Sequence, residues 1–229
     1  MRTIAIIARK GGSGKTTVAL NLAIAAHRRG LTAVVADSDP QRSSVDLMRR
    51  RQGGPLVVET SGRELFSLQA ASVRNGVDTL IIDTPAAQEA DLSNAIVLAD
   101  LSLFVVRPTL VDFYSLARTL RVARHLHKPS LVVLNQAPHQ RGGVEPPAVR
   151  NALAALELMR LPVSPAILRM RAAYPSALAR GCSAEEYSDE AAASEIEQLW
   201  SNVRREAFER ECWPRPPFSD LFVDDHPIF

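Results

Sequence analysis

Short runs of apolar and β-branched residues alternate with runs of helical spacing along most of the chain. Continuous apolar runs are typical of strands buried on both faces, whereas helices repeat apolar positions three and four residues apart. Strands are predicted at 3–8, 31–36, 56–59, 79–82, 101–106, 131–134 and 163–168, and helices at 15–29, 43–51, 63–74, 92–98, 113–126, 147–158 and 188–210. This alternation predicts an α/β fold whose mostly parallel, twisted sheet carries helices on both faces.

The chain of 229 residues suits one such domain. We expect the domain to occupy residues 1–212 and the Pro- and aromatic-rich stretch 213–229 to form a C-terminal tail. The first apolar run is too short for a signal peptide, and no later run is long enough to span a membrane.

A glycine-rich loop, residues 10–17, joins the first predicted strand to the first predicted helix. Glycines let the backbone turn its N–H groups around an anion, and a helix N-terminus favours negative charge. Lys15 is expected to reach the β- and γ-phosphates of a nucleoside triphosphate, and the Thr16 hydroxyl to bind Mg²⁺. The sequence therefore predicts a P-loop nucleotide site made of Gly11, Gly12, Ser13, Gly14, Lys15, Thr16 and Thr17.

Carboxylates follow two further predicted strands. Asp37 and Asp39 come at the end of the second strand, and Asp83 ends the apolar run Leu80-Ile81-Ile82. Carboxyl ends of parallel strands meet at the edge of the sheet where ligands bind. Asp83 is typical of a Walker B residue, which holds Mg²⁺ through water, and Asp37 is expected near the same ion.

The loop Lys-Gly-Gly-Ser-Gly-Lys-Thr-Thr resembles the deviant Walker A motif of the ParA/MinD superfamily of ATPases, and Asp37-Ser38-Asp39-Pro40-Gln41 resembles its Asp-x-Asp-Pro-Gln element. The resemblance implies ATP and Mg²⁺ as cofactors and a homodimer that forms on ATP binding. It makes Lys10 the lysine that contacts the partner's phosphates and Asp39 the residue that orients the attacking water. It also makes Asn135 an adenine contact.

Arginines late in the chain resemble basic residues of short plasmid-type ParA proteins. That resemblance implies non-specific DNA binding, for which the candidates are Arg169, Arg171, Arg180, Arg204 and Arg205. A solvated or ion-paired helix face remains the alternative for each of them.

The resemblance implies a DNA-partition ATPase that moves a plasmid or chromosome, with hydrolysis stimulated by a ParB-like or other small DNA-binding adaptor. Because no segment precedes the first strand, no operator-reading domain is expected. A positioning ATPase for a protein cargo shares every motif. A MinD-like regulator is disfavoured because Asp224, Asp225 and Pro227 do not suit a membrane-bound helix, so no membrane partner is expected. An ATP-dependent metabolic ligase is a further alternative.

Composition changes this picture little. The formal net charge of +2 does not by itself require a nucleic-acid partner. Lysine occurs only at positions 10, 15 and 128, and two of these lie in the glycine-rich loop. Cys182 and Cys212 have no metal or disulfide spacing, which favours a reducing cytoplasm. The resemblance to ParA proteins implies association with the nucleoid in the ATP state.

Overall fold

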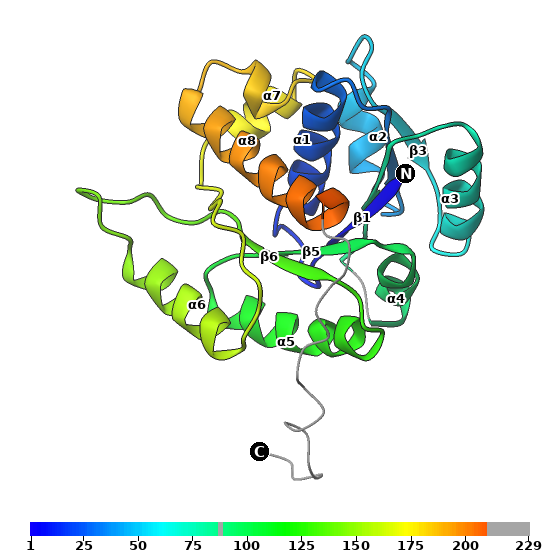
Figure 1. Cartoon of the computed structure of the whole chain (residues 1–229). Helices are drawn as coiled ribbons and strands as arrows, with labels where there is room; N and C mark the ends of the chain where they lie inside the picture. Colours follow the sequence, from blue (N-terminus) through cyan, green and yellow to red (C-terminus); the bar gives the residue numbers. More distant parts are fainter. Residues whose placement is uncertain (87–88, 210–229) are drawn as a thin grey trace.

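The computed structural model describes residues 1–86 and 89–209. Its centre is a sheet of six parallel strands in the order β3-β2-β4-β1-β5-β6 (Figure 1). The strands are β1 (Arg2–Ile7), β2 (Ala33–Asp37), β3 (Leu56–Glu59), β4 (Thr79–Asp83), β5 (Leu101–Val106) and β6 (Ser130–Leu134). The predicted α/β fold with a parallel sheet is confirmed.

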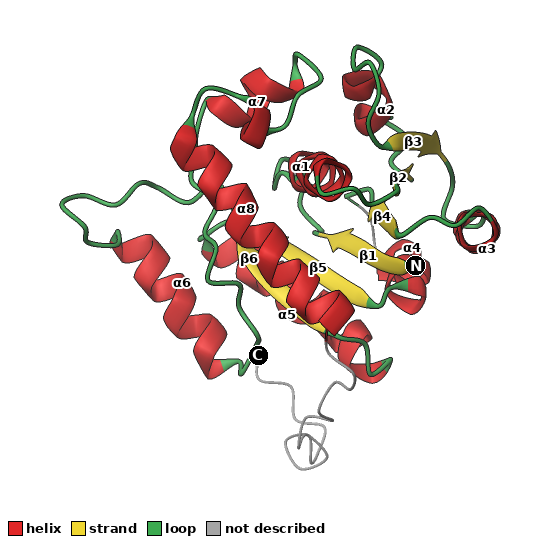
Figure 2. Cartoon of the chain, turned by 45° about the horizontal axis from the view of Figure 1, so that its top comes forward, coloured by secondary structure: helices red, strands yellow, loops and turns green. Residues whose placement is uncertain are grey.

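Helices form a layer on each face of the sheet (Figures 1 and 2). One layer holds α1 (Lys15–Arg28), α2 (Ser43–Met48), α7 (Ala173–Leu178) and α8 (Glu190–Arg204). The other holds α3 (Leu65–Arg74), α4 (Glu89–Leu98), α5 (Leu110–His125) and α6 (Pro147–Leu158). A 3₁₀ turn at Ala184–Glu186 precedes α8, and a π-helical turn at Arg205–Glu209 follows it.

Alternate residues of the central strand feed the two hydrophobic cores. Ile4 and Ile6 face the layer of α1 and α8, while Ala5 and Ile7 face the layer of α4 and α5. The sequence predicted one apolar stripe on α1, but residues 18–26 of α1 are buried on every side. This difference arises because α8, α7 and the 3₁₀ turn cover the side of α1 that faces away from the sheet.

The strand predicted at 163–168 is wrong. Val163 makes one isolated bridge to Val132, and Arg169 makes another to Ala137. The segment runs beside β6, but Pro162 and Pro165 have no N–H to donate to a ladder. The sequence also missed α7, since Pro175 argues against a helix unless it lies in the first turn, where the missing N–H costs little.

Two other predictions concern the C-terminal part of the chain. The helix predicted at 188–210 begins instead at Glu190, after the N-cap Asp189, whose side chain accepts from the Ala192 N–H. Arg210 and the predicted tail 213–229 lie outside the described residues. Among the described residues, no helix combines the length and apolarity needed to cross a membrane.

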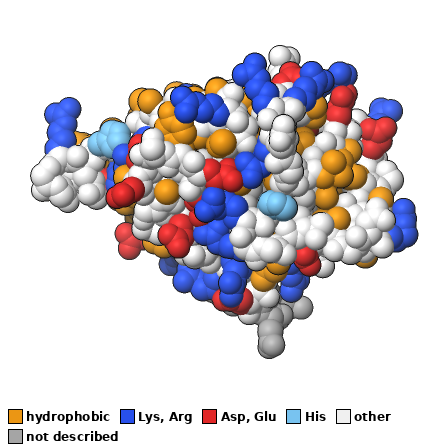
Figure 3. Space-filling view, turned by 90° about the horizontal axis from the view of Figure 1, so that it is seen from above, with side chains coloured by type: hydrophobic (Ala, Val, Ile, Leu, Met, Phe, Trp, Pro, Cys, Tyr) orange, Lys and Arg blue, Asp and Glu red, His pale blue; other side chains and the backbone are white. Residues whose placement is uncertain are grey.

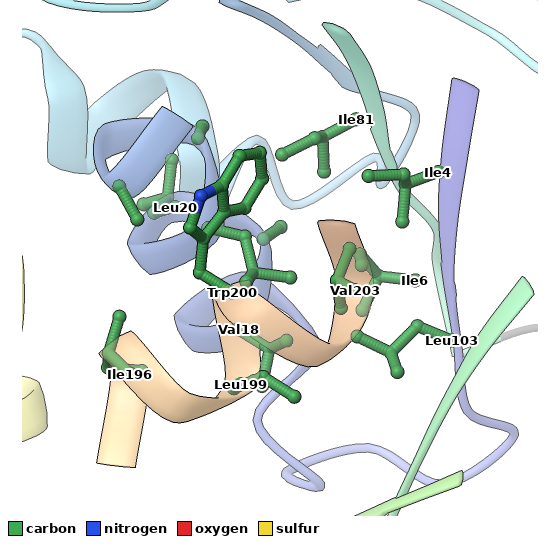
Figure 4. Close-up of a cluster of buried hydrophobic side chains, with 14 of the residues drawn as sticks. Ile4, Ile6, Val18, Leu20, Ile81, Leu103, Ile196, Leu199, Trp200 and Val203 are labelled. Carbon is green, nitrogen blue, oxygen red and sulfur yellow. The ribbon is translucent and has the colours of Figure 1, made fainter. Parts of the chain in front are cut away.

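Trp200 is the largest fully buried side chain of the core, and we expect it to carry much of the stability of α8. It lies beside Leu20 of α1 (Figure 4), and its ring meets that of Phe208 edge-on at 6.3 Å between centroids. Trp200→Ala should lower the free energy of unfolding by about 3–5 kcal/mol, because a large cavity is left in a packed core. Urea unfolding measures this. Leu158→Ala, at a side chain that is 86% exposed, should change little; equal losses would contradict this account of the core.

Candidate nucleotide-binding site

The glycine-rich loop connects the C-terminal end of β1 to the first turn of α1. Gly12 and Gly14 have left-handed backbone conformations, with φ of 72° and 90°. A Cβ on Gly14 would lie 2.2 Å from Nδ2 of Asn135, so only glycine fits there. The loop is therefore shaped by its glycines into a concave turn that leads into a helix N-terminus, which is the geometry of an anion site.

The two lysines of this loop differ in their surroundings. Lys15 is 7% exposed, and burial lowers its pKa below the ordinary value, while the charges of Asp83 and Asp39 act in the opposite direction. Lys10 is exposed. A buried ammonium group beside two carboxylates suits a bound phosphate, whereas the exposed lysine is available to a group outside the site.

The register of the sheet places the acidic residues beneath the loop. Because β2 and β4 are neighbours with Asp37 opposite Asp83, both carboxylates lie at one edge of the sheet, next to the end of β1. The end of β2 is tied to that of β4, since both the N–H and the hydroxyl of Ser38 donate to the carbonyl of Asp83, at 3.0 and 2.9 Å. Three neighbouring strands thus build the site.

Asp83 is fully buried, and its two carboxylate oxygens have different surroundings. Its Oδ2 accepts from the Thr16 and Ser44 hydroxyls, each at 2.8 Å, while Oδ1 is buried with no hydrogen-bond partner among the described residues. Burial raises the pKa of Asp83 to about 6, against the lowering effect of those two hydroxyls. A bound cation would stabilise the ionised form of this carboxylate, which has few positively charged neighbours.

Asp37 and Asp39 occupy different positions. Asp37 is buried and accepts from the backbone N–H groups of Asp39 at 3.2 Å and Val45 at 3.1 Å. Its pKa is raised because burial outweighs those hydrogen bonds. Asp39 is half-buried, and its Oδ1 accepts from the Gln41 N–H at 2.9 Å. Asp37 therefore lies under the site and Asp39 at its entrance.

The donor set fits a magnesium–nucleotide complex. The hydroxyl of Thr16 and the carboxylates of Asp37 and Asp83 are hard oxygen ligands, which Mg²⁺ prefers, either directly or through water. The unpartnered Oδ1 of Asp83 can accept a bond from a cation or its bound water, and the buried Lys15 can pair with a phosphate. Bound Mg²⁺ would neutralise phosphate charge there, and the loop glycines would supply N–H donors.

The Asn135 side chain is hydrogen-bonded to the glycine-rich loop, whereas an adenine contact would need its amide to be free. Its Nδ2 donates to the carbonyl of Ser13 at 2.7 Å, and Nε2 of the next residue, Gln136, donates to the carbonyl of Gly12 at 2.8 Å. Gln136 has a left-handed backbone with φ of 51°, which turns its side chain back from the end of β6. In this arrangement the two amides hold the glycine-rich loop, and the adenine contact stays a prediction.

Sequence reasoning missed two residues of this site. Ser44 lies in the first turn of a predicted helix, and nothing in the sequence indicates that its hydroxyl donates to the buried Asp83. Gln136 gave no signal except that it follows the asparagine at the end of a strand. Both depend on how β4 and β6 are placed beside β1 in the sheet, which the chain order alone does not give.

Most of the predicted DNA-binding arginines pair with carboxylates of the same chain. Arg169 is 10% exposed and pairs with Glu145, and Arg171 pairs with Glu195 at 2.8 Å. The other pairs are Arg204 with Glu209 at 3.0 Å and Arg205 with Glu206 at 3.7 Å, while Arg180 lies over the Tyr187 ring. The structure does not gather the five into one patch, and their contact with DNA stays a prediction.

The glycine-rich loop and the carboxylates of Asp37 and Asp83 lie within the part of the chain that a family model matches. Residues 4–183 match the CobQ/CobB/MinD/ParA nucleotide-binding domain. The chain belongs to this family. The resemblance inferred from residues 10–17 and 37–41 is thereby confirmed.

Two relatives match this chain over different shares of their length. The maintenance of carboxysome distribution protein A of Halothiobacillus neapolitanus is 27% identical over 215 residues, covering 88% of this chain and 95% of the relative. The protein of that name from Gloeobacter kilaueensis is 34% identical over 126 residues, or 53% of this chain and 56% of the relative.

Solved structures share the fold. Cyanothece McdA in complex with ATP superimposes with a TM-score of 0.73 at 20% identity, covering 90% of this chain and 96% of that one. MinD of Pyrococcus horikoshii with Mg-ADP gives 0.70 at 19% identity, covering 88% and 95%.

The buried charge of Asp83 predicts a pH-dependent stability for the nucleotide-free protein. Because burial favours the protonated acid, this group's contribution weakens as pH rises from about 4, the pKa of an unfolded carboxyl, to about 6. Asp83→Asn is neutral throughout. We expect it to exceed the wild type in unfolding free energy by about 3 kcal/mol at neutral pH, with the gap closing toward pH ~4.

Urea unfolding at several pH values measures the difference. The exposed carboxylate variant Asp46→Asn serves as control and should not show the same pH-dependent gain. A loss of stability in Asp83→Asn at neutral pH would mean that the ionised carboxylate has a partner that this arrangement lacks.

Proposed function

We propose that this chain is an ATP-driven positioning ATPase for a protein cargo. MgATP binding closes a homodimer around two nucleotides, and hydrolysis opens it. The observation that carries the ATP-dependent dimer is the pair of lysines in one phosphate loop: Lys15 is buried within its own site, and Lys10 is exposed at the rim. A second cation beside a triphosphate is useful where charge develops during phosphoryl transfer, so an exposed one suits the nucleotide of a facing copy.

Within each site we propose roles that follow the geometry. Lys15 and the loop amides bind the β- and γ-phosphates, while Thr16, Asp37 and Asp83 surround the Mg²⁺. Asp39, at the entrance, orients the attacking water. Asn135 holds the loop closed before nucleotide arrives and turns to the adenine edge when it is bound; a side-chain amide offers both a donor and an acceptor.

The surface next to Lys10 is suited to a second copy of the chain. The first turns of α5 expose Leu110, Val111 and Tyr114 by 80%, 57% and 77% of their surface. Lys10 and the same part of α5, at Asp112 and Ser115, line one small cavity. Large apolar side chains exposed side by side at the nucleotide rim favour burial against another protein surface, which supports a dimer that closes there.

The proposed cargo is a protein assembly rather than a plasmid. The sequence motifs alone are shared by DNA-partition and cargo-positioning ATPases. Two relatives, one of them matched over nearly its whole length, are named for maintaining carboxysome distribution, which favours the cargo alternative. The stimulating partner is then proposed to be an adaptor on that cargo in place of a ParB-like protein, with nucleoid DNA as the surface that the ATP-bound dimer occupies.

ATP should produce dimers through the α5 surface. Analytical ultracentrifugation with ATP and Mg²⁺ should show dimers of the wild type and monomers without nucleotide. Tyr114→Glu should remain monomeric because it places a charge in the apolar interface, while its affinity for a fluorescent ATP analogue is unchanged.

Leu158→Glu is the matched control. Leu158 is 86% exposed on α6, so this variant should dimerise as the wild type does. A wild type that stays monomeric with ATP would sink the proposed dimer, and dimers of Tyr114→Glu would exclude the α5 surface.

The cargo function is tested in the organism that encodes the chain. Deletion of the gene should cluster or misplace one protein assembly without changing plasmid or chromosome inheritance, and Lys10→Ala should not restore its distribution. Loss of a plasmid with a normal arrangement of protein assemblies would favour partition instead. Live-cell imaging of tagged assemblies and plasmid-retention counts distinguish the two.

A further inference from the structure

Two side-chain amides at the end of β6 hold two successive carbonyls of the glycine-rich loop. Nδ2 of Asn135 donates to the carbonyl of Ser13 at 2.7 Å, and Nε2 of Gln136 donates to the carbonyl of Gly12 at 2.8 Å. The Gln136 amide lies close over the loop, since a Cβ on Gly14 would be 3.6 Å from its Nε2. Asn135 is proposed above to turn to adenine when nucleotide binds, which would leave Gln136 as the remaining side-chain link between β6 and the loop.

The direction of each of these carbonyls also sets the direction of the next N–H group. In a planar trans peptide the carbonyl oxygen and the following N–H point in opposite directions, and no peptide bond of the described residues is cis. The carbonyls of Gly12 and Ser13 point toward the end of β6, so the N–H groups of Ser13 and Gly14 point away from it. Neither N–H has a hydrogen-bond partner among the described residues. Two successive N–H groups turned to the same side in this way suit an anion.

The side of the loop away from β6 is the side of the magnesium site. In the sheet, β5 and β6 lie on one side of β1, whereas β4 and β2, which end at Asp83 and Asp37, lie on the other. The buried Lys15, which suits a phosphate, interacts with Asp83 on that side. The hydrogen bonds from β6 therefore turn the N–H groups of the loop toward the place where the phosphates are expected.

The backbone of Gln136 is held on both sides. The residue before it donates its N–H to the carbonyl of Val106 in β5 at 2.8 Å, and the residue after it, Ala137, donates to the carbonyl of Leu168 at 3.0 Å. The loop of residues 138–146, which projects from the body of the molecule at the left of Figures 1 and 3, begins beyond this anchor. Gln136 is thus fixed to the sheet rather than to the projecting loop.

Gln136 also has a backbone conformation that does not favour glutamine. Its φ of 51° lies in the left-handed region, which glycine and asparagine tolerate better than other residues. An asparagine would suit this backbone, but its amide is one methylene shorter and would not reach the carbonyl of Gly12. For the backbone alone asparagine is the better residue, whereas the hydrogen bond to the loop requires glutamine.

We propose that Gln136 is a positioning residue for the nucleotide phosphates, because it fixes the peptide between Gly12 and Ser13 with the Ser13 N–H facing the phosphate site. It acts through the loop and touches no phosphate itself. The inference rests on the proposed function in that it takes this loop as the phosphate site. ADP and ATP share the phosphates next to the loop, so Gln136 contributes to the binding of both, whereas Lys10 is proposed to act during hydrolysis on the nucleotide of a facing copy.

The test is titration of the full chain with fluorescent analogues of ADP and ATP in the presence of Mg²⁺. Gln136→Asn should bind both nucleotides roughly three- to tenfold more weakly, the effect of losing one hydrogen bond. Gln136→Glu should bind more weakly still, because an ionised carboxylate has no proton to donate to the carbonyl and adds negative charge near the phosphates. The hydrolysis rate of Gln136→Asn at saturating ATP should stay within about twofold of the wild type, as for a loss of uniform binding.

Urea unfolding of the nucleotide-free proteins separates positioning from folding. Gln136→Asn should unfold at the wild-type urea concentration or slightly above it, because asparagine suits the left-handed backbone. Gln136→Gly, which also suits this backbone, should repeat the loss of nucleotide affinity. The matched control is Gln140→Asn, four residues along the chain, whose amide donates to Glu145 at 2.6 Å and not to the loop. It should bind both nucleotides as the wild type does.

Wild-type affinity of Gln136→Asn for both nucleotides would overturn the inference. So would a loss confined to ATP or to the rate at saturation, or an affinity loss matched by an equal loss of unfolding free energy. ADP binding needs no second copy of the chain, so the two proposals fail separately. A wild type that stays monomeric with ATP refutes the proposed dimer, while the ADP titration still decides the role of Gln136.

Discussion

The buried carboxylate of Asp83 is the constraint on which the geometry of the site depends. The strand order puts β4 between β2 and β1, so this side chain lies fully buried beneath the phosphate loop. Two hydroxyls, from Thr16 and Ser44, satisfy one oxygen and leave the other unpartnered among the described residues. Lys15 is a buried positive charge that interacts with Asp83. A magnesium–nucleotide complex would supply a cation for the carboxylate and phosphates for the lysine.

The same carboxylate connects the loop to the rest of the molecule. Thr16 lies in the first turn of α1 and Ser44 in the first turn of α2, so the N-terminal ends of both helices are hydrogen-bonded to Asp83. From there α1 runs beneath α8, and α2 runs to the junction with the segment after α7. Any change of partners at Asp83 on nucleotide binding would act on the first turns of two helices at once. Packed helices tend to shift as units, which gives a route from the nucleotide to distant surfaces.

The sequence was sufficient for the parts of the fold that depend on local pattern. Strands buried on both faces are continuous apolar runs, and the glycine-rich loop has an unmistakable spacing, so β1 to β6 and the phosphate loop were predicted close to where they lie. The segment 163–168 failed because its apolar residues resemble a strand while two prolines prevent a ladder. Arg169 and Arg171 pair with Glu145 and Glu195, which are distant in sequence, so no local pattern indicates these ion pairs. Such pairings depend on tertiary packing, as does the contact of Asn135 with Ser13.

We propose that Lys10 acts on the nucleotide of a facing copy, whereas Asp39 acts on the nucleotide of its own subunit. Mixing two inactive variants, Lys10→Ala and Asp39→Asn, tests it most directly by the rate of ATP hydrolysis. Half of the dimers in an equal mixture pair one variant with the other, and each has one site with both residues intact, so roughly a quarter of the wild-type rate should return. Each variant alone should stay inactive. A mixture that is no more active than its components would contradict the account, because Lys10 and Asp39 would then serve the same subunit.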